Sequence, residues 1–186
     1  MKKRMLAMLF AVVMACGAAG CGGNKEPEVD AAVAAELQAE LQTYDAQLTA
    51  EAAADAGMYT IANGAVVSGQ DKWDDFLDGE NESVVLCQFS KNGGAMLDYV
   101  MRQKDGSYLV VSDLTRDGYE YEKKEDYKTQ VFTQIKVFED FRVQEGGKPY
   151  TVCVMTNDAE LDAATFLQYW TDLSYEENGA FMLFVI

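Results

Sequence analysis

The chain has 186 residues, of which 31 are acidic, 15 are basic and none is histidine, so its formal net charge at neutral pH is −16. This excess of carboxylates argues against a nucleic-acid partner, because such binding depends on lysine and arginine side chains that neutralise phosphates. The absence of histidine excludes Ser-His-Asp and Cys-His catalysis and removes the commonest transition-metal ligand.

The first 20 residues have the layout of a secretory signal peptide. Three basic residues at positions 2–4 precede an apolar run over 5–15, and small residues occupy 18–20. The apolar run is shorter than the ~20 residues that a membrane-spanning helix needs. We therefore expect residues 1–20 to be a leader that is removed, and not a permanent transmembrane helix.

Cys21 directly follows the small residues Ala18-Ala19-Gly20, a pattern that resembles the lipobox of bacterial lipoproteins. An ordinary signal-peptidase site with an incidental cysteine is the alternative. The glycine-rich stretch over 21–29 is typical of a flexible tether, which favours the lipobox. We therefore expect cleavage before Cys21 and lipid attachment to its thiol. The mature protein would then be anchored on the extracytoplasmic face of the cell membrane, where two acyl chains suffice for a stable anchor.

The remaining chain, 30–186, has the length of a single domain. It contains two cysteines, Cys87 and Cys153, each within an apolar, strand-like run. An exported protein can form a disulfide. Cysteines in such runs, however, commonly pack as small hydrophobic residues. We favour buried free thiols and leave the disulfide open.

The domain begins with a stretch over 30–56 that is rich in alanine, glutamate, glutamine and leucine, all strong helix formers. Apolar residues recur in it at helical spacing. They are Val33, Leu37, Leu41, Tyr44 and Leu48. The pattern predicts one long helix packed against its own domain, with a stalk or a coiled-coil partner as alternatives.

A hairpin and a short helix are expected next. Asn63-Gly64 separates two short apolar runs and is typical of a tight hairpin turn. Ser68 is expected to cap a helix over 70–77. The predicted buried face of that helix consists of Trp73, Phe76 and Leu77.

The centre of the chain predicts a series of strands separated by turn residues, which indicates an antiparallel meander. In one of them, Leu97, Tyr99 and Met101 alternate with polar residues that include Asp98 and Arg102. The predicted strands cover 83–90, 95–103, 108–112, 119–122, 129–138 and 150–155.

Asn157 and Glu160 have the spacing of a capping box for a last helix. The apolar end of the chain, 181–186, is expected to form a strand. The predicted buried face of the helix consists of Leu161, Phe166, Tyr169, Trp170 and Leu173. The predicted fold class is therefore α+β, an antiparallel meander sheet with an N-terminal Ala-rich helix and a C-terminal helix packed on it.

One motif suggests a functional site. When Gly118 is aligned with the glycine of a calcium-binding loop, Asp113, Thr115 and Asp117 fall at ligand positions, but a lysine occupies the last one. A complete calcium loop is therefore excluded, and partial cation binding remains open. The alternative that we favour is a turn whose side-chain oxygens accept from backbone N–H groups, with Arg116 paired to a neighbouring carboxylate.

Other signals of chemistry are absent from the sequence. The acidic run over 74–79 does not fit a calcium loop, because a phenylalanine falls where an oxygen ligand is required. Acidic residues are so numerous that a catalytic carboxylate pair can be chosen anywhere, so their abundance identifies none. We therefore assign no catalytic residue, no metal site and no cofactor.

Several of these residues together resemble a known family. The matching positions are Tyr59-Thr60-Ile61, Asn63-Gly64, Gly69-Gln70, Trp73, Phe76-Leu77 and the run over 113–118. They are similar to the uncharacterised small lipoproteins of Gram-positive gut bacteria, which are classed as a domain of unknown function. The resemblance covers residues 57–155, with Asp-x-Thr-Arg-Asp over 113–117 as its most specific part. It implies export and a shared fold, but no activity.

The sequence therefore predicts a non-enzymatic, lipid-anchored binding or interaction module whose protein, peptide or glycan ligand it does not identify. The main alternative is a carboxylate-dependent acid/base enzyme that acts on cell-wall or extracellular glycan. A purely structural envelope protein is a third possibility. A concave cleft with two facing carboxylates, one of them desolvated, would favour the enzyme.

Overall fold

The computed structural model describes residues 29–90, 94–116 and 126–186. The expected leader, the lipid site Cys21, the tether up to residue 28, the strand expected at 119–122 and Asp117 lie outside the described residues. The helices are α1 (Ala31–Leu41), α2 (Ala50–Asp55), α3 (Gln70–Asp78) and α4 (Ala163–Thr171). The strands are β1 (Tyr59–Ala62), β2 (Ala65–Ser68), β3 (Ser83–Phe89), β4 (Ala95–Arg102), β5 (Tyr108–Asp113), β6 (Tyr127–Phe132), β7 (Gln134–Phe141), β8 (Tyr150–Thr156) and β9 (Ala180–Val185).

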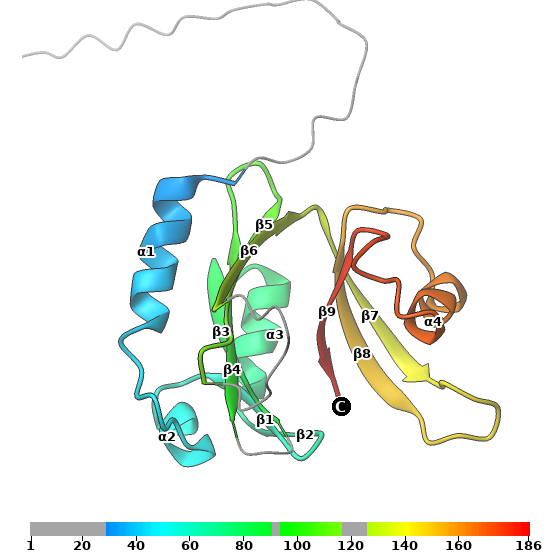
Figure 1. The fold of residues 1–186 in the computed structure, drawn as a ribbon, viewed down its shortest axis with the longest axis horizontal. Helices are drawn as coiled ribbons and strands as arrows, with labels where there is room; N and C mark the ends of the chain where they lie inside the picture. Colours follow the sequence, from blue (N-terminus) through cyan, green and yellow to red (C-terminus); the bar gives the residue numbers. More distant parts are fainter. Residues whose placement is uncertain (1–28, 91–93, 117–125) are drawn as a thin grey trace, which may run out of the picture.

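These elements form two sheets, with helices α1, α2 and α4 on their outer sides and α3 between them (Figure 1). A six-stranded sheet has the order β2-β1-β3-β4-β5-β6, and a three-stranded sheet has the order β7-β8-β9. Helices α1 and α2 cover one face of the larger sheet, α3 packs on its other face, and α4 covers the outer face of the smaller sheet. The α+β class, with helices at both ends of the chain and mostly antiparallel strands, is confirmed.

The meander is only part of this topology. Strands β3 and β4 each pair antiparallel with the next strand in sequence, as the turn residues predict, and β5 pairs antiparallel with β6. Strands β1 and β3 pair in parallel instead, because β2 returns the chain to the starting end of β1 and α3 leads from there into β3. The Asn63-Gly64 hairpin between β1 and β2 is confirmed, and both turn residues have positive φ.

The strand predicted over 129–138 is in fact two strands that belong to different sheets. Strand β6 ends at Phe132, β7 begins at Gln134, and the chain changes direction at Thr133. The side chain of Asn157 holds this bend, since its Oδ1 accepts from the Thr133 N–H at 2.9 Å and its Nδ2 donates to the Val131 carbonyl at 3.3 Å. Sequence periodicity does not show the bend, because the apolar alternation continues through it.

The capping box expected at Asn157 is therefore wrong. Helix α4 begins after Asp162, whose Oδ1 accepts from the Thr165 N–H at 2.8 Å. Of the face predicted for this helix, Leu161 and Phe166 are buried, whereas the Leu173 side chain is 80% exposed. The prediction for Leu173 was wrong because the helix ends at Thr171, so the side chain no longer follows the helical face.

The single helix predicted over 30–56 is also wrong, because α1 ends at Leu41 and α2 starts at Ala50. Polar side chains in between bond to the local backbone, which competes with helix formation. The Thr43 hydroxyl donates to the Glu40 carbonyl at 2.7 Å, and Thr49 Oγ1 caps α2. The predicted apolar stripe still faces the sheet, with Leu37, Leu41 and Leu48 buried and Val33 and Tyr44 packed beside them.

Helix α3 begins at Gln70, as predicted, but Ser68 does not cap it. Its N-cap is Gly69, which has φ of 74° and no side-chain cap, and Ser68 instead donates to the Met58 carbonyl at 3.3 Å. A Cβ atom on residue 69 would lie 2.3 Å from the Met58 carbonyl oxygen, so only glycine fits there. Trp73 and Phe76 are buried as predicted, but Leu77 is 38% exposed.

Three buried clusters correspond to the three places where layers meet. One lies between the two sheets with α3, one under α1 and α2, and one between the smaller sheet and α4. Cys87 belongs to the second and Cys153 to the first, and both are buried free thiols, as expected. The C-terminal segment pairs as strand β9, which confirms that prediction.

Candidate functional site

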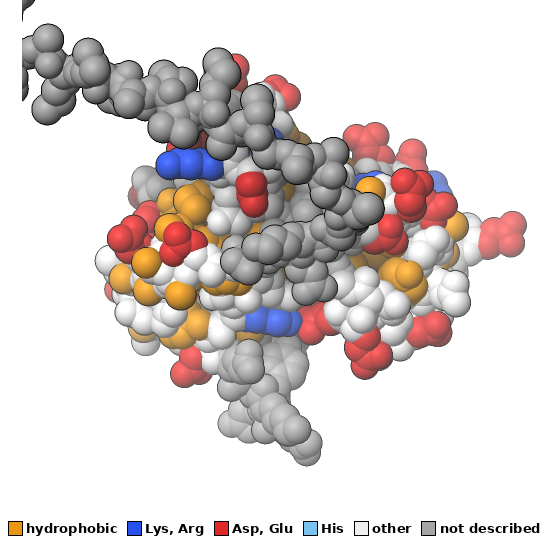
Figure 2. Space-filling model, turned by 90° about the horizontal axis from the view of Figure 1, so that it is seen from above, with side chains coloured by type: hydrophobic (Ala, Val, Ile, Leu, Met, Phe, Trp, Pro, Cys, Tyr) orange, Lys and Arg blue, Asp and Glu red, His pale blue; other side chains and the backbone are white. Residues whose placement is uncertain are grey.

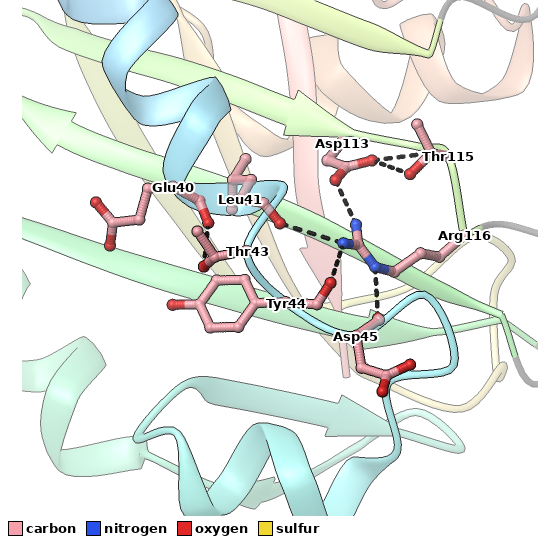
Figure 3. Close-up of polar contacts among 8 residues, drawn as sticks. All are labelled: Glu40, Leu41, Thr43, Tyr44, Asp45, Asp113, Thr115 and Arg116. Atoms are coloured by element: carbon pink, nitrogen blue, oxygen red, sulfur yellow. Dashed lines mark hydrogen bonds and ion pairs between the residues drawn. The ribbon is translucent and has the colours of Figure 1, made fainter.

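The Asp113 motif lies where β5 ends, beneath the turn that follows α1 (Figure 3). Asp113 is the last residue of β5 and is fully buried. Its Oδ1 accepts from both the backbone N–H of Thr115, at 2.9 Å, and the Thr115 hydroxyl, at 2.6 Å. These two bonds close the turn that takes the chain out of the sheet.

Arg116 uses its guanidinium group to join this turn to the end of α1. Its Nη1 donates to the Asp113 carboxylate, and its Nη2 donates to the carbonyls of Leu41 at 3.2 Å and Tyr44 at 2.8 Å. Its Nε donates to the Asp45 carbonyl at 2.9 Å. Leu41 is the last residue of α1, and Tyr44 and Asp45 belong to the turn that follows it, so these bonds fix both the helix end and the turn.

This geometry matches the structural turn and does not suit a cation. Both oxygens of Asp113 already accept hydrogen bonds, and the positive charge of Arg116 lies against them. Within the described ranges, no three histidine, cysteine, aspartate or glutamate residues are placed to hold a metal ion. One feature differs from the expected surface pair, because the side chains of Arg116 and Asp113 are only 7% and 0% exposed.

The structure also contains a buried carboxylate that the sequence did not single out, Asp98 on β4. It points between the two sheets, and the Ser112 hydroxyl on β5 donates to its Oδ1 at 2.5 Å. Burial raises the pKa of Asp98 to about 6, although hydrogen bonds from Ser112 and Gln88 act in the lowering direction. A carboxyl group of this kind can change its charge in mildly acidic surroundings.

Asp98 was missed because its environment depends on tertiary structure. The alternation around it is typical of a strand with one solvated face. In the structure, α1 covers one face of β4 and the smaller sheet covers the other. The only available signal was a carboxylate next to apolar residues in the middle of a predicted sheet, and the sequence does not show which face is covered.

A shallow hollow of about 210 Å³ opens at the starting ends of β1 and β3, beside the end of α1. Its charged lining residues are Glu40 and Lys72. Burial raises the pKa of the Tyr44 hydroxyl at this hollow, and the neighbouring Glu40 adds to the effect. Asp98 is not part of the lining, so the desolvated carboxylate and the hollow are separate features.

The charged side chains on the surface do not form a localised patch on the face seen in Figure 2. Acidic side chains are spread over the face seen in Figure 2 and do not gather at one position, and basic side chains are few. No helix in the described part of the chain is long and apolar enough to cross a bilayer.

Comparison with known proteins adds no family, since no family model, no curated protein and no solved structure matches this chain.

Proposed function

We propose that this protein is a lipid-anchored, extracytoplasmic interaction module. The observation that carries the proposal is how the domain begins. The predicted tether leads directly into α1, and Arg116 fixes the end of that helix to the strand that ends at Asp113. The element next to the anchor is thereby held to the central sheet by hydrogen bonds from a buried, ion-paired arginine, which suits a domain displayed from a flexible tether.

The polar residues of the motif at the end of β5 support the same interpretation. Asp113, Thr115 and Arg116 bond to one another and to backbone carbonyls, so their donors and acceptors are engaged in holding the chain together. The negative charge spread over the face seen in Figure 2 favours solubility and the selection of partners, which are properties of a surface and not of a reaction centre.

The first experiment tests the anchor. The full-length protein is expressed in a bacterium that processes lipoproteins, and the membrane-bound product is analysed by mass spectrometry. We expect a mature N-terminus at residue 21 carrying diacylglycerol. Cys21→Ser should abolish lipid labelling and retain the leader, whereas the control Cys16→Ser should leave both unchanged. Lipid on the Cys21→Ser protein would contradict the proposal.

The second experiment tests binding. The mature protein is screened by thermal shift against cations, glycan fragments and peptides, because a ligand that binds only the folded state raises the melting temperature. We expect stabilisation by a peptide or a glycan that mass spectrometry recovers unchanged. Conversion of a stabilising glycan into products would reject a non-catalytic module.

One observation favours the alternative, a carboxylate-dependent enzyme acting on cell-wall or extracellular glycan. The pKa of Asp98, about 6, lies near the range that general acid catalysis requires. The side chain is buried, so substrate could reach it only if the two sheets moved apart. The test compares glycan hydrolysis by the wild-type protein and by Asp98→Asn. Activity that Asp98→Asn abolishes would establish the enzyme, and equal turnover by both would reject a role for Asp98.

A further inference from the structure

The inner face of the six-stranded sheet is the face that packs against the smaller sheet. Its side chains change from apolar to polar along the strands. At one end it is apolar, with Val84, Val100 and Val110 in the cluster between the sheets. Toward the other end, Asp98 pairs with Ser112, and Ser112 pairs with Lys128 on β6, so these three side chains form one row across the sheet. Gln88, on β3, lies on the same face one step further along. We call Gln88, Asp98, Ser112 and Lys128 the polar row.

The polar row faces the segment that leads into and forms β9. Gln88 Nε2 donates to the Leu183 carbonyl of β9 at 2.6 Å. Lys128 Nζ lies 3.0 Å from Glu176 Oε2, in the turn before β9, and 6.0 Å from the centre of the Phe181 ring. The contacts that Gln88 and Lys128 of the polar row make with the smaller sheet therefore converge on β9 and the turn before it.

The two sheets are joined in a way that permits relative movement. In the described residues they belong to separate hydrogen-bonded ladders, and only Thr133 separates β6 from β7. Their packing depends on side chains, including the Trp73–Phe184 and Phe132–Phe181 ring contacts at 5.3 and 6.0 Å between centres. Because the sheets are connected by a bend of one residue and packed through side chains, a single buried charge can alter the contact between them.

We propose that Asp98 is a proton-controlled latch, which in its neutral form keeps the three-stranded sheet closed on the six-stranded sheet and in its ionised form loosens the contact with β9. The physical reason is the cost of a carboxylate charge in a buried interface. Separation of the sheets would let water reach the ionised group. The neutral form carries no such cost, so the closed packing is retained.

The charged groups around Asp98 do not remove this cost. Lys128 is separated from Asp98 by Ser112 in the row and pairs with Glu176. Strand β9 presents a backbone carbonyl, that of Leu183, which is no partner for an anion. Asp113 and Arg116 belong to the opposite face, under α1. Among the described residues, the groups that bond to Asp98 are the neutral side chains of Ser112 and Gln88.

The direction of the pH effect follows from the raised pKa. The closed structure raises the pKa of Asp98 from 3.8 to about 6, so the closed state holds the proton more tightly than an open or unfolded state does. Closure is therefore favoured at low pH and weakens as the pH rises from about 4 to about 6. A shift of about two pKa units corresponds to a change of about 100-fold in the closing equilibrium.

Trp73 can report on the latch, because it is buried at the contact with Phe184. The chain has two tryptophans, so Trp170→Phe in the full-length protein leaves Trp73 as the single emitter. We expect its emission to shift to longer wavelength, and quenching by acrylamide to increase, as the pH is raised from 4.5 to 7.5 in steps. Both changes should have a midpoint near the pKa of Asp98.

Two variants in the same background complete the experiment. Asp98→Asn should keep Trp73 protected at every pH. The control Asp105→Asn should behave as the parent, because Asp105 makes the same kind of bond to a serine hydroxyl, at 2.6 Å from Ser107, but at an exposed site. Trp73 emission that is independent of pH, or a pH shift that persists in Asp98→Asn, would overturn the proposal.

Discussion

Arg102 and Arg116 perform the same task on opposite faces of the six-stranded sheet. Arg102, at the end of β4, donates to the Phe76 carbonyl at 2.9 Å and so caps the end of α3 on the inner face. Arg116, just after β5, donates to carbonyls at the end of α1 on the outer face. Each arginine thereby attaches a helix to the sheet through backbone carbonyls at the helix end, in addition to the backbone N–H groups that already bond there.

The buried Asp113–Arg116 pair predicts a large loss of stability when its cation is removed. In Arg116→Met, Asp113 stays buried without its partner and the carbonyls after α1 lose their donors, so we expect a loss of about 3 kcal/mol in the free energy of unfolding. Urea denaturation measures it. The control is Lys128→Met, which removes a more exposed ion pair and should cost less than about 1 kcal/mol. Equal losses in the two variants would contradict this assignment.

Gly69 and Gly79 form a matched pair that separates steric contact from backbone strain. Both have positive φ, but a Cβ atom on residue 69 would meet the Met58 carbonyl oxygen at 2.3 Å, whereas nothing lies within 4 Å of one on residue 79. Gly79→Ala should therefore cost about 1 kcal/mol, the strain alone. Gly69→Ala should cost a few kcal/mol more, because the start of α3 must move. Thermal unfolding checks both, and similar melting temperatures would refute the steric argument.

Replacement of Leu173 by glycine is expected to increase the stability of the protein. It follows α4 with φ of 54° and its side chain is 80% exposed, so a leucine is strained there and buries little apolar surface. Leu173→Gly should stabilise the protein by about 1 kcal/mol, because glycine adopts this conformation without the steric penalty. Leu173→Ala keeps the strain and should have little effect. A glycine variant no more stable than the alanine variant would show that positive φ is not the cause.

The two buried cysteines predict slow thiol chemistry in the folded protein. Burial raises the pKa of Cys87 to about 12, and the pKa of Cys153 is also raised by burial, so neither forms the reactive thiolate near neutral pH. We expect a thiol reagent to leave Cys87, which lies under α1, unmodified in buffer and to modify both residues in denaturant, as mapped by mass spectrometry of the peptides. Rapid modification of Cys87 in buffer would contradict this expectation. Modification of Cys153 in buffer would report opening of the inter-sheet cluster.

Most of the elements could be predicted from the sequence because their signals are local. The Asn63-Gly64 turn, the strand alternation around Leu97 and the helical spacing of Leu37 and Leu41 all operate over a few residues. Local polar residues also explain one failure, since Thr43 and Thr49 end α1 and start α2 inside a stretch of strong helix formers. The prediction of one helix followed the high average helix propensity of that stretch and did not give enough weight to these two side chains.

The residues that make up the candidate site could be predicted from the sequence, but their structural role could not. The spacing of Asp113, Thr115 and Arg116 indicates a turn with an ion pair. The carbonyls that Arg116 reaches lie on Leu41 and Tyr44, more than 70 residues earlier, and no local pattern relates them to it. The burial of this pair, which decides its energetic importance, results from α1 packing over the end of β5.

By itself, the sequence determined the class of the fold, the order of most elements and most of the buried positions on the helices, because each of these depends on neighbours within about one turn or one strand. Only the tertiary structure decided that the chain bends at Thr133 into a second sheet and that this sheet covers Asp98. The physical reason is that the cost of a buried charge depends on what packs above it, and that layer comes from strand β9 at the far end of the chain.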